Sequence, residues 1–238
     1  MNIKVETHSH SLMSGHAYST IKEMVEAAKA YGLEAVSLTE HAPDMPGSCG
    51  LYYFQNYKVV PREQEGIRLL LGVELNILDE TGVVDMPEDV LAKQDIVVAS
   101  IHTPCYRGAL TREAITESYV NAMRNPYIHI IGHPDDSRFP IDYEVLVKAA
   151  KETNTLLEVN NSSLSPNSFR KGAEDNYVEL LHYCKKYQVY VALGSDAHID
   201  IDVGNTSNSV QMLEKCGFPE ELVANTTWEK FHPFLIKS

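Results

Sequence analysis

The sequence predicts an α/β fold in which seven parallel strands form a closed or nearly closed barrel. Apolar runs of strand length alternate with amphipathic helical segments, and the first strand, helix and strand span about forty residues, as in a βαβ unit. Several runs are apolar throughout, which is typical of parallel strands buried on both faces. Side chains able to bind a metal follow six of the runs. A barrel gathers the ends of all its strands at one face, whereas an open sheet gathers ligands at one switch point, so these positions favour the barrel.

The individual elements follow from hydrophobic periodicity and from residues that begin or end helices. A capping box at 20–23 begins the first helix, and Gly32 is placed to end it. Thr111 and Asp142 begin two later helices, and a second capping box at 226–229 begins a short terminal helix. The expected strands are 1–7, 34–39, 67–74, 95–101, 127–132, 155–159 and 189–193, and two further helices are expected over 171–187 and 205–215.

The composition is that of an ordinary globular protein, with 44% hydrophobic and 22% charged residues, and we expect residues 1–238 to form a single domain. No apolar run reaches the roughly 20 residues that a membrane-spanning helix needs, and the first residues lack the features of a signal peptide. The four cysteines are widely spread, so we expect free thiols and a cytoplasmic protein. The net charge of −13 argues against tight binding of nucleic acid, but metal ions could reverse the local charge for a small phosphorylated substrate.

Histidine and acidic side chains at the strand ends are the candidate metal ligands. His8 and His10 lie two residues apart at the end of the first strand, so both imidazoles point to one face. A single pair of this kind is a weak indication, but five later strands also end in metal-competent residues. Because one zinc ion takes four ligands, the full set indicates two or three divalent metal ions, with Glu74 placed to bridge two of them. The nine candidates are His8, His10, His16, His41, Glu74, His102, His133, Asp196 and His198.

Other polar residues have weaker claims to the metal site. His129 is expected in the barrel interior, and His182 and His232 lie on helices. Glu40 would face away from His41 on a regular strand, towards a neighbouring layer of side chains or solvent.

Two residues after the sixth strand are predicted to bind substrate. The amide of Asn161 ends that strand, and the guanidinium of Arg170 follows it and could clamp a phosphate with two parallel hydrogen bonds. Arg107 and Arg138 lie in earlier loops and have weaker claims. The long aromatic-rich connection 42–66 leaves the active end of the second strand. It is open to two interpretations, a lid over the site or an aromatic plug on the barrel rim.

Taken together, these motifs resemble those of the PHP (polymerase and histidinol phosphatase) superfamily along nearly the whole chain. The segments 158–163 and 170–172 most resemble the stand-alone YcdX-like phosphatase branch. The wider resemblance is carried by Thr7-His8-Ser9-His10, Thr39-Glu40-His41, Gly72-Val73-Glu74, His102, Gly132-His133-Pro134 and Gly194-Ser195-Asp196-Ala197-His198.

The resemblance implies a distorted (βα)7 barrel of the TIM type with a trinuclear metal site. Zinc is the first expectation, and manganese and iron are the alternatives, because imidazole and carboxylate ligands suit all three. By matching position, the first metal would be held by His8, His10, Glu74 and Asp196, the second by Glu74, His102 and His133, and the third by His16, His41 and His198.

We therefore expect a metal-dependent phosphatase that hydrolyses small phosphomonoesters through a hydroxide bridging two metals. Glu74, Asp196 and His198 are the predicted catalytic residues. The superfamily also includes nuclease-type domains, so a phosphodiesterase or nuclease at the same site is the alternative, and a non-catalytic metal-binding module is another. We find no serine or cysteine paired with a free base, which predicts direct transfer of the phosphoryl group to water. The sequence leaves the oligomeric state open.

Overall fold

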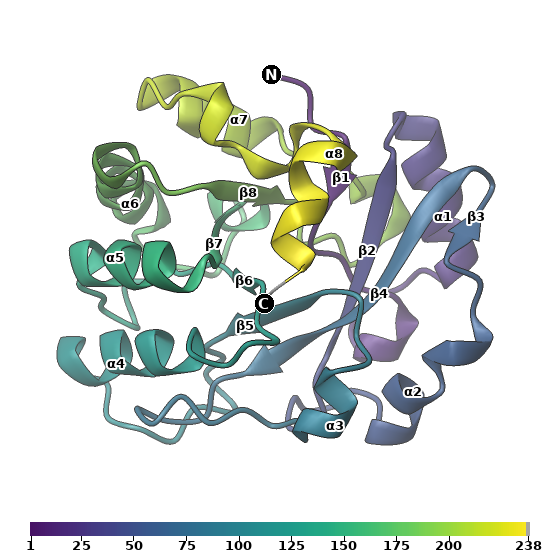
Figure 1. Ribbon diagram of the computed structural model, residues 1–238, viewed down its shortest axis with the longest axis horizontal. Coiled ribbons are helices and arrows are strands. Elements are labelled where there is room, and N and C mark those ends of the chain that lie inside the picture. The colour runs from purple at the N-terminus through teal and green to yellow at the C-terminus, as the bar shows by residue number, and fades with distance from the viewer. Residues whose placement is uncertain (237–238) are drawn as a thin grey trace.

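The protein is a nearly closed barrel of parallel strands with helices on its outer surface, as seen in a computed structural model that describes residues 1–236 (Figure 1). Neighbouring barrel strands pair in parallel, which confirms the predicted fold class. In order of pairing, the strands are β1 (Val5–Glu6), β2 (Ala35–His41), β4 (Ile67–Asn76), β5 (Val97–Ser100), β6 (Ile130–Ile131), β7 (Leu156–Asn160) and β8 (Val191–Gly194).

The strands differ from the prediction mainly in length. β1 and β6 hold two residues each, and an unpredicted strand, β3 (Glu63–Gln64), pairs antiparallel with the start of β4. Two residues after β1 ends, the backbone N–H of His8 donates to the carboxylate of Glu6 instead of to a neighbouring strand. The short pairings of β1 and β6 make the barrel irregular, as the family resemblance implies.

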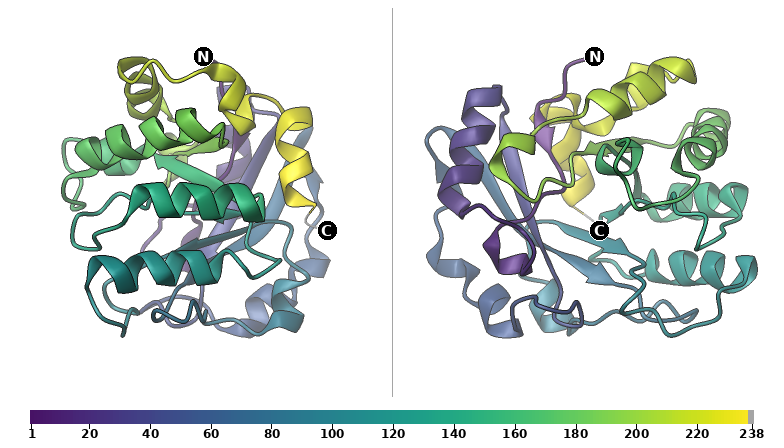
Figure 2. Two further views of the ribbon diagram at one scale, coloured as in Figure 1. Left: turned by 60° about the vertical axis from the view of Figure 1, so that its left-hand side comes forward. Right: turned by 180° about the vertical axis from the view of Figure 1, so that it is seen from behind.

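The helices cover the outside of the barrel, and α4, α5, α6 and α7 lie one beside another along it (Figure 2). None of the helices over residues 1–236 has the length and apolar surface needed to cross a membrane. The helices are α1 (Ile21–Tyr31), α2 (Leu51–Gln55), α3 (Glu88–Leu91), α4 (Arg112–Ala122), α5 (Tyr143–Thr153), α6 (Ala173–Tyr187), α7 (Ser207–Lys215) and α8 (Trp228–Phe231).

The predicted caps are confirmed at three helices and wrong by one residue at the fourth. Thr20 forms the predicted capping box at the start of α1, and the side chains of Thr111 and Asp142 cap α4 and α5. At α8 the cap is Thr227, whose side chain accepts from the N–H of Lys230. Thr226 cannot serve because it ends the preceding 3-10 turn, and the chain becomes extended only at the next residue.

The barrel closes between β8 and β1 through few contacts. At the active end, Ser9 and Ala197 form an isolated parallel bridge. Further down, the side-chain amide of Asn225 donates to the carbonyl oxygens of Val5 and Leu193, 2.8 Å from each. A side chain from the C-terminal segment thus replaces part of the missing ladder between the two strands.

Side chains inside the barrel form layers because every second residue of a strand points inward. On β4 the inward residues are Leu70, Gly72 and Glu74. The lowest layer is apolar and is closed by Phe231 of α8, which lies in front of the strands in Figure 1. In the middle layer, a Cβ on Gly72 would lie 2.0 Å from the carbonyl oxygen of Ile96, so the position admits no side chain. This spacing places Glu74 on the top layer.

The connection 42–66 packs against the outside of the barrel. Phe54 and Tyr57 are buried, and the Tyr57 hydroxyl donates to the carbonyl oxygen of Gly72, 3.1 Å away. Rings of Tyr53, Phe54 and Tyr57 meet edge to face. Met45 is the part of this segment that lines the pocket described below. These contacts favour the aromatic plug over the lid.

Candidate metal centre

The predicted ligands converge at the C-terminal end of the barrel, around the buried carboxylate of Glu74. Oε1 of Glu74 lies 2.8 Å from Nε2 of His133 and 3.2 Å from Nε2 of His102. Oε2 faces a different set of rings, at 2.8 Å from Nδ1 of His41, 3.4 Å from Nε2 of His8 and 3.6 Å from Nε2 of His10. The two oxygens of one carboxylate therefore face two groups of imidazoles, as a bridging ligand requires.

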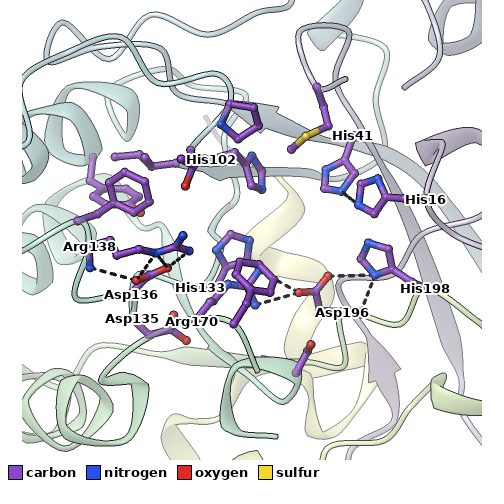
Figure 3. A pocket seen from close by; sticks show the side chains of 18 of the residues that line it. His16, His41, His102, His133, Asp135, Asp136, Arg138, Arg170, Asp196 and His198 are labelled. Atoms are coloured by element: carbon purple, nitrogen blue, oxygen red, sulfur yellow. Dashed lines mark hydrogen bonds and ion pairs between the residues drawn. The ribbon is translucent and has the colours of Figure 1, made fainter. Parts of the chain in front are cut away.

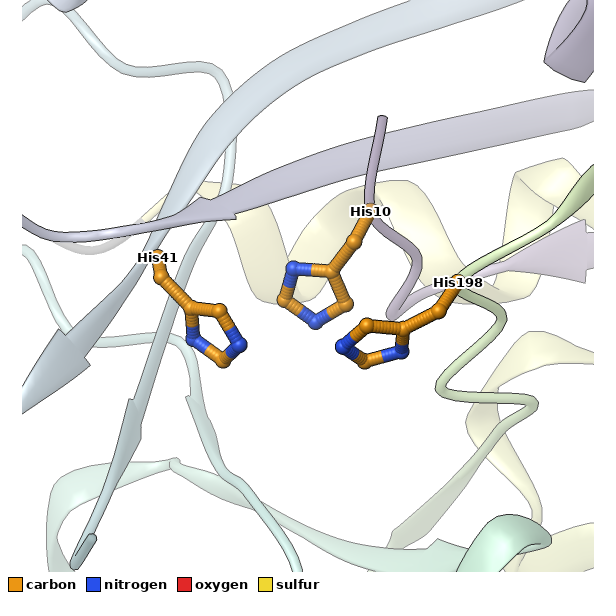
Figure 4. A group of neighbouring side chains, drawn as sticks. All are labelled: His10, His41 and His198. Carbon is orange, nitrogen blue, oxygen red and sulfur yellow. The ribbon is translucent and has the colours of Figure 1, made fainter. Parts of the chain in front are cut away.

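A second part of the cluster lies around Asp196, which follows β8. Its Oδ1 is 3.4 Å from Nε2 of His10 and 3.8 Å from Nε2 of His8. The rings of His41 and His198 lie 4.3 and 4.4 Å from the ring of His10, measured between centroids (Figure 4).

His16 completes the set from the loop after β1. Its Nε2 lies 3.2 Å from Nε2 of His41, and its ring stacks on those of His41 and His198. All nine predicted ligands are thus brought together.

The imidazoles are oriented by hydrogen bonds at their other ring nitrogens. Nδ1 of His8 is 2.8 Å from Glu158, Nδ1 of His102 is 2.7 Å from Oδ1 of Asn76, and Nδ1 of His198 is 2.9 Å from a backbone carbonyl. These contacts leave Nε2 of each ring pointing into the cluster. Partners of this kind fix the tautomer and the direction of metal-binding histidines.

The donor set fits divalent metal ions. Within residues 1–236, four buried atoms of the cluster have no hydrogen-bond partner: Nε2 of His8, Nε2 of His10, Nδ1 of His41 and Oε2 of Glu74. Nδ1 of His41 and Oε2 of Glu74 lie close together but not in hydrogen-bonding geometry. Buried polar atoms are rarely left without a partner, because losing their hydration is costly. A cation bound between these atoms would provide the partner that their lone pairs lack.

Four sets of three residues place their ligand atoms within 4.8 Å of one another. One of them, His8 with His10 and Asp196, falls within the first ligand set that the family resemblance implies. Glu74 belongs to two sets, and the remaining set contains His10 in addition to His41 and His198. The sets are His8–His10–Asp196, His8–Glu74–His133, His41–Glu74–His102 and His10–His41–His198.

The charges of the cluster are arranged for cation binding. Burial opposes ionisation of Glu74, but the nearby rings of His102, His8 and His41 outweigh it and hold its pKa well below the ordinary value. The pKa of Asp196 is likewise well below its ordinary value, with burial opposed by His8 and other neighbours. Burial and the rings of His41 and His198 hold the pKa of His10 well below its ordinary value. The carboxylates are therefore charged and the His10 ring is neutral.

Two buried acids, Glu40 and Glu158, support the candidate ligands. For Glu40 the sequence leaves two positions open, a neighbouring layer of side chains or solvent. Glu40 is fully buried and accepts a hydrogen bond from Ser14 Oγ, 2.6 Å away, while Ser14 contacts Nδ1 of His10 at 2.9 Å. Glu158, which holds His8, was given no role. A local signal for Glu158 is an acid at an inward position of a buried strand, two residues after the apolar Leu156.

Two ligands have strained backbones. His133 and Asp196 have φ values of 30° and 57°, in the left-handed region that residues with side chains rarely adopt. The N–H of His133 donates to Oε2 of Glu158 at 2.7 Å, and the N–H of Asp196 donates to the carbonyl oxygen of His8 at 2.9 Å. Such strain persists where surrounding contacts fix the chain, and it is concentrated at functional sites.

A pocket of about 600 Å³ opens over the cluster. Arg170 lines it, with Nη1 and Nη2 each 3.2 Å from Oδ2 of Asp196 (Figure 3). The Asn161 side chain points elsewhere, because its Oδ1 accepts from the N–H groups of Asn208 and Ser209 at the start of α7. The contacts of Asn161 thus fix a helix start and give no support to the predicted role in substrate binding.

Residues excluded from the site by the sequence analysis do lie away from it. His129 is buried, with Nδ1 accepting from the N–H of Val97. His182 and His232 are exposed or lie on the outer helices. Of the two arginines with weaker claims to substrate, Arg107 pairs with Asp44 at the surface, 2.9 Å away, whereas Arg138 lines the pocket.

Comparison with known proteins identifies the family. A model of the PHP domain matches residues 6–193, so the chain belongs to the PHP domain family, which confirms the resemblance. A probable phosphatase of Thermoanaerobacter sp. (strain X514) is 43% identical over 235 residues, which cover 99% of this chain and 95% of that protein. A probable phosphatase of Clostridium botulinum (strain Hall) is 42% identical over the same length, with 99% and 95% covered.

Solved structures share the fold at low sequence identity. The histidinol phosphate phosphatase of Lactococcus lactis, complexed with zinc, L-histidinol and phosphate, has a TM-score of 0.60 at 18% identity, covering 92% of this chain and 95% of that one. A chain of archaeal ribonuclease P, solved with mature tRNA, has a TM-score of 0.60 at 13% identity, covering 97% and 89%. Because the same fold occurs in a phosphatase and in a chain of ribonuclease P, the function of this chain has to be argued from its site.

Proposed function

We propose that this chain is a metal-dependent phosphatase that hydrolyses phosphomonoesters of small molecules, with residues 1–238 forming one PHP domain. The observation that carries the proposal is the position of Glu74, whose two oxygens face separate groups of imidazoles at the floor of the pocket. The two relatives compared above, from Thermoanaerobacter and Clostridium botulinum, are named as probable phosphatases, which supports the same reaction class.

In this proposal the nine ligands hold up to three divalent ions. The Lactococcus lactis neighbour contains zinc, and the imidazole and carboxylate donors here also suit manganese and iron. When bound, the ions would supply positive charge opposite the phosphate and lower the pKa of water at the site. The proposed sets are His8, His10, Glu74 and Asp196; Glu74, His102 and His133; and His16, His41 and His198.

The chain's own residues position the substrate and the centre. Glu74 and Asp196 provide the negative charge that keeps neighbouring cations together. The His198 side chain, which is 28% exposed, lines the pocket beside them. Arg170 provides a buried guanidinium beside the floor, with its side chain 8% exposed. A guanidinium already held by Asp196 loses little freedom when its donors bind a phosphate oxygen.

The shape of the site favours a monoester over a polynucleotide. The walls of the pocket include Arg170, Phe139 and Phe169. The chain has a net charge of −13, which opposes the approach of a long polyanion, whereas one terminal phosphate needs only the local charge of the floor.

The test compares two chromogenic esters on metal-replete protein. We expect p-nitrophenyl phosphate to be hydrolysed much faster than bis(p-nitrophenyl) phosphate, with both rates lost after chelation and restored by a divalent ion. A preference for the bis-ester would replace the proposal with a phosphodiesterase. No hydrolysis of either ester, with ions bound in stoichiometric amount, would indicate a metal-binding module without catalysis.

A further inference from the structure

The pocket has two unlike ends. One end is the cluster of imidazoles and carboxylates, and Figure 3 shows Arg138 and Asp136 on the opposite side. The wall around that far end combines the buried apolar side chains Ile101, Tyr119, Phe139 and Ile141 with the carboxylates of Asp135 and Asp136. With a volume of about 600 Å³, the pocket is in the range that encloses a whole small molecule rather than a phosphate alone.

Phe169 lies between the two arginines of the pocket. The guanidinium carbon of Arg170 is 5.2 Å from the centre of its ring, and that of Arg138 is 5.5 Å from it. The Phe169 side chain is 71% exposed, unusually high for a phenylalanine with two cationic neighbours. An exposed ring held between two guanidiniums offers an edge or a face on which a flat group of the substrate can stack.

Arg138 is fixed in place but has donors to spare. Its Nε and Nη2 donate to the carboxylate of Asp136, and its guanidinium lies 6.0 Å from the ring of Phe139. Asp136 is buried and also contacts the N–H of Lys171. The paired atoms leave Nη1 of Arg138 for an acceptor on a ligand. Because Asp136 compensates the charge, this end of the pocket is suited to one acceptor rather than to a second phosphate.

We propose that the site prefers phosphomonoesters of alcohols that carry a flat aromatic ring with an acceptor beyond it. The ring packs against Phe139 and Phe169, and the acceptor bonds to Arg138. This deepens the proposed function and rests on it. A sugar phosphate is disfavoured because it has no flat apolar face to pack against Phe139 and Phe169, and hydroxyl groups placed against those rings would lose water without gaining partners from them.

The test uses three primary alkyl phosphates with leaving alcohols of similar acidity: ribose 5-phosphate, 2-phenylethyl phosphate and 2-(4-carboxyphenyl)ethyl phosphate. On metal-loaded wild-type protein, kcat/KM should rise at least about tenfold from the first to the second, as expected for burial of a ring. It should rise again by a few-fold for the third. Equal values for the first two, or a preference for the sugar phosphate, would overturn the proposal without any variant.

Variants then assign the preference to residues. Phe169→Ala should reduce the ratio between phenylethyl and ribose esters to below about threefold, since the stacking surface is removed. Arg138→Met should remove the gain from the carboxylate while keeping the preference for the ring. Tyr52→Ala and Arg124→Met, at exposed positions away from the pocket, serve as controls and should keep the wild-type ratios.

The outcomes separate this proposal from the proposed function. If Phe169→Ala lowers kcat/KM for all three esters by one factor, the ring only supports Arg170, and the specificity role is wrong. If metal-loaded protein hydrolyses all three esters at equal rates, the phosphatase function stands and the ring preference fails. If the metal-loaded protein hydrolyses none of the three esters, both the phosphatase function and the ring preference are wrong.

Discussion

Nδ1 of His8 lies 2.8 Å from Oε1 of Glu158, and both side chains are fully buried. The contact turns Nε2 of His8 towards Glu74 in the centre of the cluster. The other oxygen of Glu158 accepts from the N–H of His133 at 2.7 Å. One carboxylate beneath the site therefore orients a side chain after β1 and fixes the strained backbone after β6.

Glu158→Gln should weaken metal binding. A glutamine of the same size can accept from His8 but cannot also accept from the N–H of His133, so one ligand loses its support. We expect a roughly 10–100-fold loss of affinity for the bound ions, measured by competition with a chelator. Glu152→Gln, at an exposed position on α5, should bind metal as the wild type does. If the two variants bind metal with equal affinity, Glu158 does not support the metal centre.

Glu74→Gln should lose both metal and activity. A neutral amide cannot offset the repulsion between neighbouring cations, and it presents only one oxygen to two groups of rings. Elemental analysis should find two or three ions per chain in the wild type and at most one in the variant. Glu117→Gln on the exposed face of α4 is the matched control. Full occupancy and normal turnover in Glu74→Gln would show that the carboxylate does not bridge.

Arg170→Ala should weaken substrate binding more than it lowers metal content. In the proposed function the buried guanidinium donates to the phosphate, so its loss should raise KM and the inhibition constant of inorganic phosphate by roughly tenfold or more. The comparison variant Arg107→Ala changes an arginine that pairs with Asp44 at the surface and should leave both constants unchanged. A loss of metal as large as the loss of phosphate binding would indicate that Arg170 supports the centre through Asp196 instead.

Phosphoryl transfer should occur directly to water, without a phosphoenzyme. Burial raises the pKa of Cys105, the cysteine nearest in sequence to a ligand, to about 11, so it is a thiol at neutral pH and a poor nucleophile. Its Sγ also donates to the carbonyl oxygen of Asp44. Turnover of a phosphate ester made chiral with oxygen isotopes should invert the configuration at phosphorus. Retention would require a covalent intermediate and would exclude direct transfer.

The contact between α5 and α6, outside the site, should stabilise the fold to an extent that depends on pH. Hydrogen bonds from Tyr187, Lys186 and Lys148 lower the pKa of Glu144 from 4.5 to about 2. A carboxyl whose pKa is depressed by folding stabilises the protein above its unfolded pKa, and that contribution is lost as the pH falls from about 4.5 to about 2. Glu144→Gln should lower the thermal midpoint at pH 7 by no more than about 3 °C, because the group is solvent-accessible.

The same difference in thermal midpoint should shrink as the solution is acidified through that window, measured by scanning calorimetry at several pH values. Glu152→Gln on the same helix controls for the loss of one negative charge. A difference that stays constant from neutral to acidic pH would show that the ion pairs between α5 and α6 do not stabilise the fold.

Much of the candidate site could be read from local sequence because strand geometry is periodic. Glu74 and His102 are at inward positions that follow Leu70 and Val98 in steps of two. The parallel pairing of the strands then brings their C-terminal ends to one face. The nine ligands could therefore be proposed without knowing any distance between them.

The contacts of two other residues depend on segments far apart in the chain. Asn161 follows a strand at the active face, yet its amide oxygen accepts a hydrogen bond from the start of α7, 47 residues away. Glu158 gains its role only when β7 lies across the barrel from His8, 150 residues earlier. A local pattern can mark Glu158 as an inward acid, but it does not specify the distant partner of either side chain.

The sequence by itself determined the fold class, the family and the residues that could bind metal, because these depend on side-chain type and on spacing along single strands. Only the tertiary structure decided which oxygen of Glu74 faces which ring, that Phe169 lies between Arg138 and Arg170, and that the segment 42–66 packs outside the barrel. These depend on how far each loop reaches and on which side chain fills the space beside it. The physical reason is that packing and charge compensation are settled between segments distant in sequence, after the strands have fixed the frame.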